Sequence, residues 1–346
     1  MNNRFRFAGL CVWLWMMGTA AQAQWQVQNV GTKASLRGLC AVDATVVWAS
    51  GTRGTFLRTT DGGATWRVGT VPGAGSLDFR DVEAFDADHA FLLSIGNGGS
   101  SRIYQTTDGG RTWALRFQNT DKDAFFDALA FWDRRHGLAM SDPVDGRFMI
   151  MATDDGGKTW LPVPGGRMPA ALPGEGGFAA SGTCLIAQGK RNAWLVTGGK
   201  TARVFRSTDR GCSWKAVIAP LGSGTESSGI FSIAFRDAKN GVIVGGDYQQ
   251  PEAAAQNAAF TRDGGLTWAL TGRMPAGFRS AVAWVRTSRG WAWVAVGTSG
   301  SDVTFDGGAT WQQLDQQNYN SVSFAQGVGW AVGPEGRVTK FVGKLE

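Results

Sequence analysis

The sequence is poor in the residues that build most catalytic and metal sites. It contains two histidines and four cysteines among 346 residues. No pair of cysteines has the spacing of a structural metal site. Nucleophilic catalysis by a Ser-His-Asp or Cys-His set therefore has little support, because such sets need a histidine placed beside the nucleophile. We expect neither a structural metal nor a cofactor.

Long apolar runs are missing after the first 23 residues, so no membrane span is expected in the mature chain. The first 23 residues have the order of a signal peptide. Arg4 and Arg6 are followed by an apolar stretch from Phe7 to Met17 and by Ala21-Gln22-Ala23, a small-x-small cleavage site. We expect cleavage after Ala23 and export to the periplasm or the exterior of a bacterium.

An excess of charge of one sign is missing as well. Without Arg4 and Arg6 the chain carries 32 basic and 28 acidic residues, a net charge of +4, and it has no long run of lysine or arginine. Binding to nucleic acid or to an acidic membrane surface is therefore not expected.

Three cysteines remain after the leader: Cys40, Cys184 and Cys212. An odd number in an oxidising compartment leaves at least one thiol free. The apolar surroundings of Cys40 and Cys184 in the sequence suit buried small hydrophobic residues. Whether Cys184 and Cys212 form a disulfide stays open.

What the chain has in excess is glycine, with 50 residues, and tryptophan, with 16. Together with the lack of helical periodicity they indicate an all-β protein with many tight turns. Six segments fit the pattern Ser/Thr-x-Asp-x-Gly-x-Thr/Ser-Trp without a gap. Their closing tryptophans are 47, 47, 54, 54 and 43 residues apart, and the segments are 59–66, 106–113, 153–160, 207–214, 261–268 and 304–311. This period is that of a propeller blade.

The aspartates of these six segments are interpreted as fold residues. In the first segment the Asp61 carboxylate can accept hydrogen bonds from the amides of the turn, while Gly63 supplies backbone freedom. A turn carboxylate that recurs in every blade serves every blade alike. The same structural role is expected for all six: Asp61, Asp108, Asp155, Asp209, Asp263 and Asp306.

The six segments are called here the boxes. Seven segments of the sequence fit the pattern of the second strand of a blade, so we predict seven blades, one more than the number of boxes. The seventh unit, residues 321–341, has neither a box nor a fourth strand, whereas the mature N-terminus begins with a lone strand-like segment, Trp25-Gln26-Val27-Gln28. Joining the two ends would close the ring and remove exposed edges. We therefore predict one domain over residues 24–346, a seven-bladed β-propeller whose last blade combines both termini.

Function is expected on the face opposite the boxes. In a four-stranded blade the boxes share a face with the turns between strands one and two, where His89 and His136 fall. The opposite face carries the longest loops, and a long link, residues 162–181, leads into blade four. Loops gathered on a rigid scaffold are the usual place for function, although tolerated drift is an equal alternative. The candidate binding residues in these loops are Asp142, Asp145, Arg147, Lys200, Arg203, Asp247 and Tyr248.

Three arginines share one register in the first strands. Arg37, Arg80 and Arg279 align with Phe126 of blade three and with Asn320 of blade seven. First strands line the central channel, so the three guanidinium groups could converge on its mouth as a site for a carboxylate or a phosphate. The alternative is local pairing of each arginine with an acid such as Asp78 or Asp81.

The repeats resemble the Asp-box (BNR) β-propellers. The run Val47-Trp48-Ala49-Ser50-Gly51-Thr52-Arg53-Gly54-Thr55 leading into the box at Arg58–Trp66 is most similar to the photosystem II assembly and stability factors and their non-photosynthetic bacterial relatives. The resemblance implies an exported scaffold or assembly factor that binds another protein through an arginine-rich patch. We therefore expect a non-enzymatic, monomeric binding protein for a protein or an anionic or glycan ligand.

The alternative function is that of a glycoside hydrolase. A pair of carboxylates for such a reaction could come from Asp81, Asp127, Asp142, Asp145 or Asp247. The sialidase type is disfavoured, since the Phe-Arg-Ile-Pro signature of that resemblance is absent, although Tyr248 or Tyr319 could stand on the correct face as the nucleophile.

Overall fold

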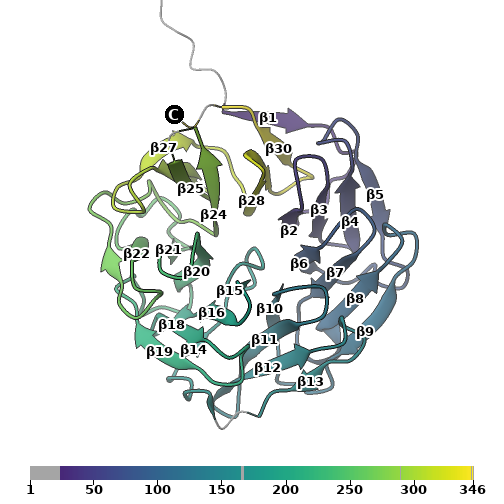
Figure 1. The fold of residues 1–346 in the computed structure, drawn as a ribbon, viewed down its shortest axis with the longest axis horizontal. Coiled ribbons are helices and arrows are strands. Elements are labelled where there is room, and N and C mark those ends of the chain that lie inside the picture. The colour runs from purple at the N-terminus through teal and green to yellow at the C-terminus, as the bar shows by residue number, and fades with distance from the viewer. Residues whose placement is uncertain (1–23, 165–166, 289, 344, 346) are drawn as a thin grey trace, which may run out of the picture.

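The computed structural model describes residues 24–346 except 165, 166, 289, 344 and 346, so the expected signal peptide lies outside the described residues. Seven antiparallel sheets stand in a ring around a central axis, with the first strand of each blade innermost (Figure 1). The predicted all-β, seven-bladed propeller is confirmed. No helix in the described part of the chain is long and apolar enough to cross a membrane.

The first three blades follow one another along the chain. A single-turn 3-10 helix, Gly98–Ser100, precedes the third strand of blade two. Blade one consists of β2 (Leu36–Ala41), β3 (Val47–Gly51), β4 (Thr55–Thr59) and β5 (Arg67–Thr70); blade two of β6 (Phe79–Ala84), β7 (Ala90–Ser94), β8 (Arg102–Thr106) and β9 (Ala114–Gln118); blade three of β10 (Phe126–Phe131), β11 (Gly137–Val144), β12 (Arg147–Thr153) and β13 (Leu161–Pro162).

Blades four to six keep the same order, but the sheet of blade five is extended. Two short strands, β14 (Glu175–Gly176) and β17 (Gly198–Gly199), join it from the chain around blade four. Blade four consists of β15 (Leu185–Gln188), β16 (Asn192–Val196), β18 (Arg203–Ser207) and β19 (Lys215–Ile218); blade five of β20 (Ser228–Phe235), β21 (Gly241–Asp247), β22 (Ala258–Thr261) and β23 (Ala269–Leu270); blade six of β24 (Ala281–Thr287), β25 (Gly290–Gly297), β26 (Gly300–Thr304) and β27 (Gln312–Asp315).

The seventh blade joins the two ends of the described chain, as predicted. Its inner strands are β28 (Ser321–Ala325), β29 (Val328–Val332) and β30 (Val338–Phe341), and its outer strand is β1 (Trp25–Gln28). Strand β1 runs antiparallel to β30, with Trp25 opposite Phe341 and Gln28 opposite Val338. Figure 1 shows the purple and yellow ends of the chain side by side. The ring is thus closed by pairing between residues 310 to 316 positions apart in sequence.

Aromatic rings fill the spaces between neighbouring blades. Trp48 of blade one meets the box tryptophan of blade two, Trp113, with ring centroids 6.3 Å apart. Trp194 of blade four stacks on Phe235 of blade five at 3.9 Å. Such rings bury large apolar areas and fix each blade against the next.

The boxes are turns held by their own side chains. The Asp61 carboxylate accepts bonds from the Thr59 hydroxyl (2.7 Å), the Thr65 hydroxyl (2.6 Å) and the Thr65 amide (2.9 Å). These hydrogen bonds from Thr65, more than any other cause, lower the Asp61 pKa to about 2. Gly62 and Gly63 adopt positive φ values of 71° and 89°. A residue with a side chain would be strained in this backbone conformation. The carboxylates of the other boxes accept the same set of bonds: Asp108, Asp155, Asp209, Asp263 and Asp306.

The boxes and the turns between strands one and two share one face of the ring, called here the box face. The Gly62 amide donates to the carbonyl of Thr45 in the first turn of the same blade. His89 and His136 lie in equivalent turns, each beside an aspartate three residues earlier in the chain. The opposite face, called the loop face, carries the starts of the first strands.

Candidate functional site

The long link into blade four does not stay at the rim but enters the central channel. Residues 177–183, called here the strap, cross the channel from blade to blade. The hydroxyl of Ser181 donates to the carbonyl of Ser280 in blade six (2.9 Å), and the Thr183 and Ser232 hydroxyls lie 2.6 Å apart. The strap separates a pocket on the loop face from a cavity of about 370 Å³ on the side of the box face, which Asp81 and Glu83 line.

The pocket on the loop face, called here the mouth pocket, has a volume of about 410 Å³. Its walls come from six blades and from the strap. It is lined by Arg37, Arg80, Phe125, Asp127, Asp142, Gly177, Phe178, Ala179, Ala180, Phe231, Tyr248, Phe278, Ser280, Thr298 and Asn320. Volumes of this order are typical of ligand sites, as is a wall of aromatic rings with a few polar groups.

Four first strands contribute a side chain to the mouth pocket at a break in their register. The pairing of each inner strand with its neighbour skips one residue there: Arg37, Arg80, Asp127 and Phe231. A bulge of this kind leaves the extra residue unpaired and turns its side chain aside. The sequence alignment placed Phe126 in this register for blade three; the structure corrects this to Asp127, one residue later.

Arg37 is the arginine of the pocket with the fewest partners. Its Nη1 donates to the carbonyl of Ala180 in the strap at 3.2 Å, and it forms no ion pair within the described residues. Burial and the neighbouring charge of Arg80 lower the Arg37 pKa to about 10. Both effects penalise the positive charge of Arg37, so an anion placed beside it would be stabilising.

Arg80 lies next to Arg37 and is partly neutralised. Its Nε donates to Asp78 at 2.8 Å, and its Nη1 donates to the carbonyl of Ala179 at 3.1 Å. Local pairing with Asp78, the alternative considered from the sequence, therefore holds for Arg80. Arg80 nevertheless lines the mouth pocket.

Arg279 does not join the other two, and the expectation of three converging guanidinium groups is corrected to two. Its side chain is 0% exposed. Its Nε donates to Asp302 at 2.6 Å, and its Nη1 donates to the carbonyl of Phe278 (2.7 Å) and to Ser299 (2.9 Å). Asp302 comes from the third strand of the same blade, so the acid that captures Arg279 is distant in sequence.

Two acids of blade three meet in the mouth pocket. Asp142 Oδ1 accepts a bond from the strap amide of Gly177 at 2.7 Å. Asp127 is 1% exposed, and its Oδ2 has no hydrogen-bond partner in the described part of the chain. Burial raises the Asp142 pKa to about 6. Burial and then the charge of Asp142 raise the Asp127 pKa well above its usual range. The pair therefore tends to hold a proton near neutral pH.

Aromatic rings line the remaining wall. Phe178 of the strap stacks on Phe231 with centroids 3.8 Å apart, and Phe278 meets Phe231 edge-on at 4.7 Å. Tyr248, which the sequence singled out, stands 6.1 Å from Phe231 and is 48% exposed. It forms the outer lip of the mouth pocket.

The other candidate binding residues lie outside the mouth pocket. Arg203 is buried and bound to Glu175 of β14, with Nε to Oε1 at 2.8 Å. Asp247 accepts a bond from the amide of Gln249 inside its own loop. The remaining three are exposed on hairpin tips: Asp145 at a φ of 50°, Arg147 donating to the carbonyl of Met168, and Lys200 donating to the carbonyl of Gly224.

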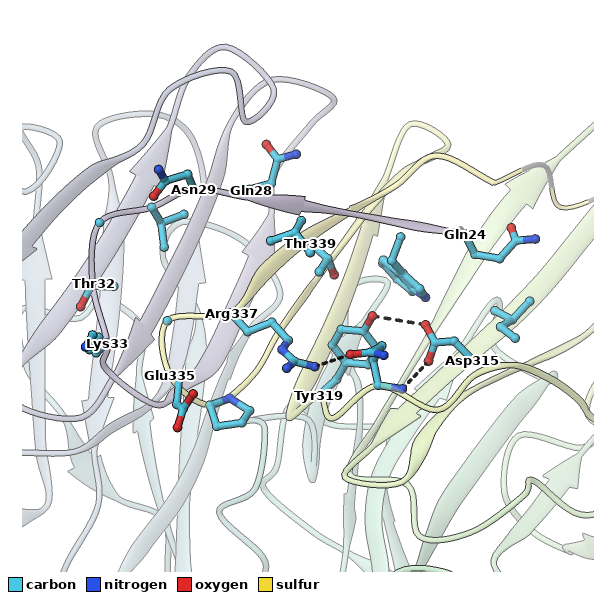
Figure 2. A pocket seen from close by; sticks show the side chains of 18 residues that line it. Gln24, Gln28, Asn29, Thr32, Lys33, Asp315, Tyr319, Glu335, Arg337 and Thr339 are labelled. Carbon is cyan, nitrogen blue, oxygen red and sulfur yellow. Dashed lines mark hydrogen bonds between the residues drawn. The ribbon is translucent and has the colours of Figure 1, made fainter. Parts of the chain in front are cut away.

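A larger groove of about 1040 Å³ lies beside strand β1 (Figure 2), and no sequence pattern predicted it. Some of the polar groups near it bond to one another. The Tyr319 hydroxyl donates to Asp315 at 3.2 Å, and Arg337 donates to Gln317 at 3.0 Å. The groove arises because the outer strand of blade seven comes from the other end of the chain.

The three cysteines of the described residues are free. Cys184 is buried and Cys212 is exposed, so these two form no disulfide. Burial raises the pKa of the Cys184 thiol well above its usual range. A thiol that resists ionisation behaves as a small apolar residue, which agrees with its apolar surroundings in the sequence.

Comparisons with known proteins agree with the architecture. The family model for the photosynthesis system II assembly factor YCF48 matches residues 74–225. A search of curated proteins found no match. A solved structure described as YCF48 bound to D1 peptide shares 18% identity over 93% of this chain and 97% of that chain, with a TM-score of 0.65. YCF48 from Cyanidioschyzon merolae shares 18% identity over 92% and 99%, with a TM-score of 0.62.

A glycoside hydrolase has the same fold in part of its length. The GH74 enzyme of Niastella koreensis shares 12% identity over 91% of this chain and 44% of that chain, with a TM-score of 0.62. At such identities the likeness concerns the fold alone. The family model covers residues 74–225, which is less than half of the chain. With its six boxes and its seven-bladed ring, this chain is therefore similar in fold to the photosystem II assembly factor YCF48.

Proposed function

We propose that this protein is an exported, non-enzymatic binding protein of the assembly-factor kind. It recognises a segment of another protein on its loop face, and an acidic group of that segment docks in the mouth pocket against Arg37 and Arg80. The observation that carries the proposal is the pair of neighbouring guanidinium groups, of which Arg37 forms no ion pair within the described residues.

The chemistry of the pocket supports a carboxylate-bearing segment. An arginine fork matches a carboxylate in geometry, and such charge-assisted bonds are about twice as strong as neutral ones. The ring of Tyr248 at the lip adds an exposed aromatic contact of the kind enriched at interfaces. A propeller of similar fold, YCF48, has been solved with a D1 peptide, which supports a protein segment as ligand. The partner of this chain need not belong to a photosystem.

Export and a monomeric state are part of the proposal. The basic, apolar and small-residue order of residues 1–23 supports cleavage after Ala23. Edman sequencing of the protein recovered from the periplasm would then begin at Gln24, whereas a start at Met1 in the cytoplasm would contradict export. Light scattering of the mature protein would give the mass of one chain.

The test of binding is capture of a partner from a periplasmic extract. Mature wild type is compared with the double variant Arg37→Ala/Arg80→Ala. The control is Arg111→Ala/Lys158→Ala, which also removes two positive charges but from exposed positions in the boxes of blades two and three. We expect one protein to be enriched by wild type and by the control, and to be lost from the pocket variant. Circular dichroism checks that all three are folded.

Two results would count against the proposal. Capture by the pocket variant at the level of wild type would show that the arginines are not the contact. Loss from the box-face control alone would place the contact on the other face.

Glycoside hydrolysis is a second candidate because the structure brings two of the five acids considered for it, Asp127 and Asp142, into one pocket. A pair with raised pKa values could supply a general acid. The remaining acids, Asp81, Asp145 and Asp247, do not line this pocket. If the enzyme hypothesis holds, a screen of oligosaccharides will show turnover that Asp142→Asn reduces at least a hundredfold; absence of turnover in wild type excludes it.

A further inference from the structure

The mouth pocket contains groups of both signs that do not neutralise one another. Arg80 pairs with Asp78, but neither pocket arginine lies within 4.0 Å of Asp127 or Asp142 in the described part of the chain. Arg80 nevertheless lies close enough to Asp127 to affect its pKa. The charge of Arg80 lowers the Asp127 pKa, whereas burial raises it. The pocket is therefore dipolar, with a cationic sector on blades one and two and an acidic sector on blade three.

The acidic sector has an unused acceptor. Asp127 Oδ2 is buried without a hydrogen-bond partner and belongs to the pocket lining. The two acids face neighbouring glycines. A Cβ added at Gly177 of the strap would lie 2.7 Å from Asp127 Oδ2, and a Cβ added at Gly176 of β14 would lie 2.9 Å from Asp142 Oδ1. Glycine at these two positions leaves room for both carboxyl groups at one corner. A buried acceptor without a partner is costly, so a donor supplied by a ligand is favourable.

The third sector is apolar. Phe231 is stacked on Phe178 and flanked by Phe278 and Tyr248. This wall can accept an aromatic ring or a branched aliphatic group, and a cation close to the ring faces is attracted as well. The three sectors together surround about 410 Å³, which is the size of a small-molecule site.

We propose that the mouth pocket binds a small zwitterion of the α-amino-acid class with an aromatic or large aliphatic side chain. The carboxylate of the ligand lies against Arg37 and Arg80, its ammonium group against Asp142 and Asp127, and its side chain against Phe231 and Tyr248. This inference goes beyond the proposed function, because it gives the pocket a ligand of its own. Since both occupants use Arg37, the amino acid competes with the segment of the protein partner.

The test is calorimetric titration of the mature protein with L-phenylalanine and two analogues. The analogue 3-phenylpropanoate lacks the ammonium group, and 2-phenylethylamine lacks the carboxylate. We expect L-phenylalanine to bind with a Kd below 1 mM and each analogue to bind at least tenfold more weakly. The inference is overturned if L-phenylalanine does not bind, or if 3-phenylpropanoate binds equally well.

Variants assign each sector. Asp142→Asn keeps an oxygen that can accept the Gly177 amide, so the strap stays in place. It should weaken L-phenylalanine at least tenfold and leave 3-phenylpropanoate unchanged. Arg37→Ala should weaken both carboxylate ligands, whereas the box-face variant Arg111→Ala should bind all three probes as wild type does. Equal weakening of both carboxylate ligands by Asp142→Asn would contradict the assignment of the ammonium group.

The outcome is separable from that of the proposed function. Capture of a protein partner without binding of L-phenylalanine leaves the binding-protein function intact and removes this inference. Binding of L-phenylalanine without any captured protein supports this inference and removes the proposed binding of a protein partner. If both occur, L-phenylalanine should release the partner from wild type, and Asp142→Asn should need at least a tenfold higher concentration for the same release.

Discussion

At the scale of single residues, surroundings decide what an arginine does. The sequence alignment placed Arg37 and Arg279 in one register. In the structure Arg279 takes the position of Leu36, one residue earlier: the Leu36 amide donates to Gly333 of the preceding blade, and the Arg279 amide donates to Gly245 of its own preceding blade. Arg279 is captured by Asp302 and is 0% exposed, whereas Arg37 faces the mouth pocket with one bond to a backbone carbonyl. The difference arises from this shift of one residue and from Asp302 in the third strand of the same blade, 23 residues away. The sequence alignment missed the shift and therefore could not separate the buried arginine from the one that faces the pocket.

Arg279 should therefore be essential for stability. Replacing it by alanine leaves the carboxylate of Asp302 buried and unpaired, which costs about 3–5 kcal/mol in comparable cases. We expect Arg279→Ala to lower the free energy of unfolding in urea by about that amount. The apolar pair Arg279→Met/Asp302→Leu should recover most of the loss. A change below about 1 kcal/mol for Arg279→Ala would show that the pair is not buried in solution.

Asp81 gives the protein a pH dependence of known sign. Burial raises the Asp81 pKa to about 7. The folded state therefore binds this proton more tightly than the unfolded state, and the associated stability is present below about pH 4 and is lost as the pH rises towards 7. The shift corresponds to up to about 4 kcal/mol.

The measurement is urea unfolding of wild type and Asp81→Asn at pH 4, 5.5 and 7. Asparagine can still accept the bond that Asp81 Oδ2 receives from the amide of Leu129. We expect the variant to gain stability relative to wild type as the pH rises. Asp142, Asp127 and Glu83 also have raised pKa values and contribute with the same sign to both proteins. A pH-independent difference between the two would contradict the assignment.

At the scale of elements, the sequence predicted those parts of the fold that are held by bonds between residues close together in the chain. Each box is a turn whose bonds lie within about seven residues, so its sequence pattern was enough to place six of the seven blades. The lone strand Trp25–Gln28 was placed by counting. The strap could not be predicted in this way, because its course depends on bonds to blades one, two, five and six. The one local sign was its run of small residues, Ala179 to Thr183, which fits a narrow channel.

Strand β1 should carry much of the stability of ring closure. Trp25 is 6% exposed, packs against Tyr319 and Phe341 with centroids 5.6 and 5.0 Å away, and donates to Ser301 of blade six. Trp25→Ala should cost about 3–5 kcal/mol in urea unfolding. Val27 in the same strand is 74% exposed, so Val27→Ala is the matched control and should stay within about 0.5 kcal/mol. Equal effects would show that β1 does not seal the ring.

At the scale of the whole molecule, the two faces of the ring are built differently. The box face consists of repeated turns whose carboxylates are fully used in their own hydrogen bonds. On the loop face the repeat is broken. Bulges turn four side chains into the mouth pocket, and the strap forms the floor of this pocket on the side of the box face. A rigid scaffold with its irregular features on one face is the arrangement expected of a binding protein.

The most direct measurement is photocrosslinking in living cells with a benzophenone amino acid placed on each face of blade five. Tyr248 lies at the lip of the mouth pocket, and Leu266 lies in the box; they are 48% and 53% exposed, which makes them a matched pair. We expect a crosslinked partner from position 248 that disappears when Arg37 and Arg80 are replaced by alanine, and none from position 266. A crosslink from position 266 alone, or from neither position, would contradict a binding function on the loop face.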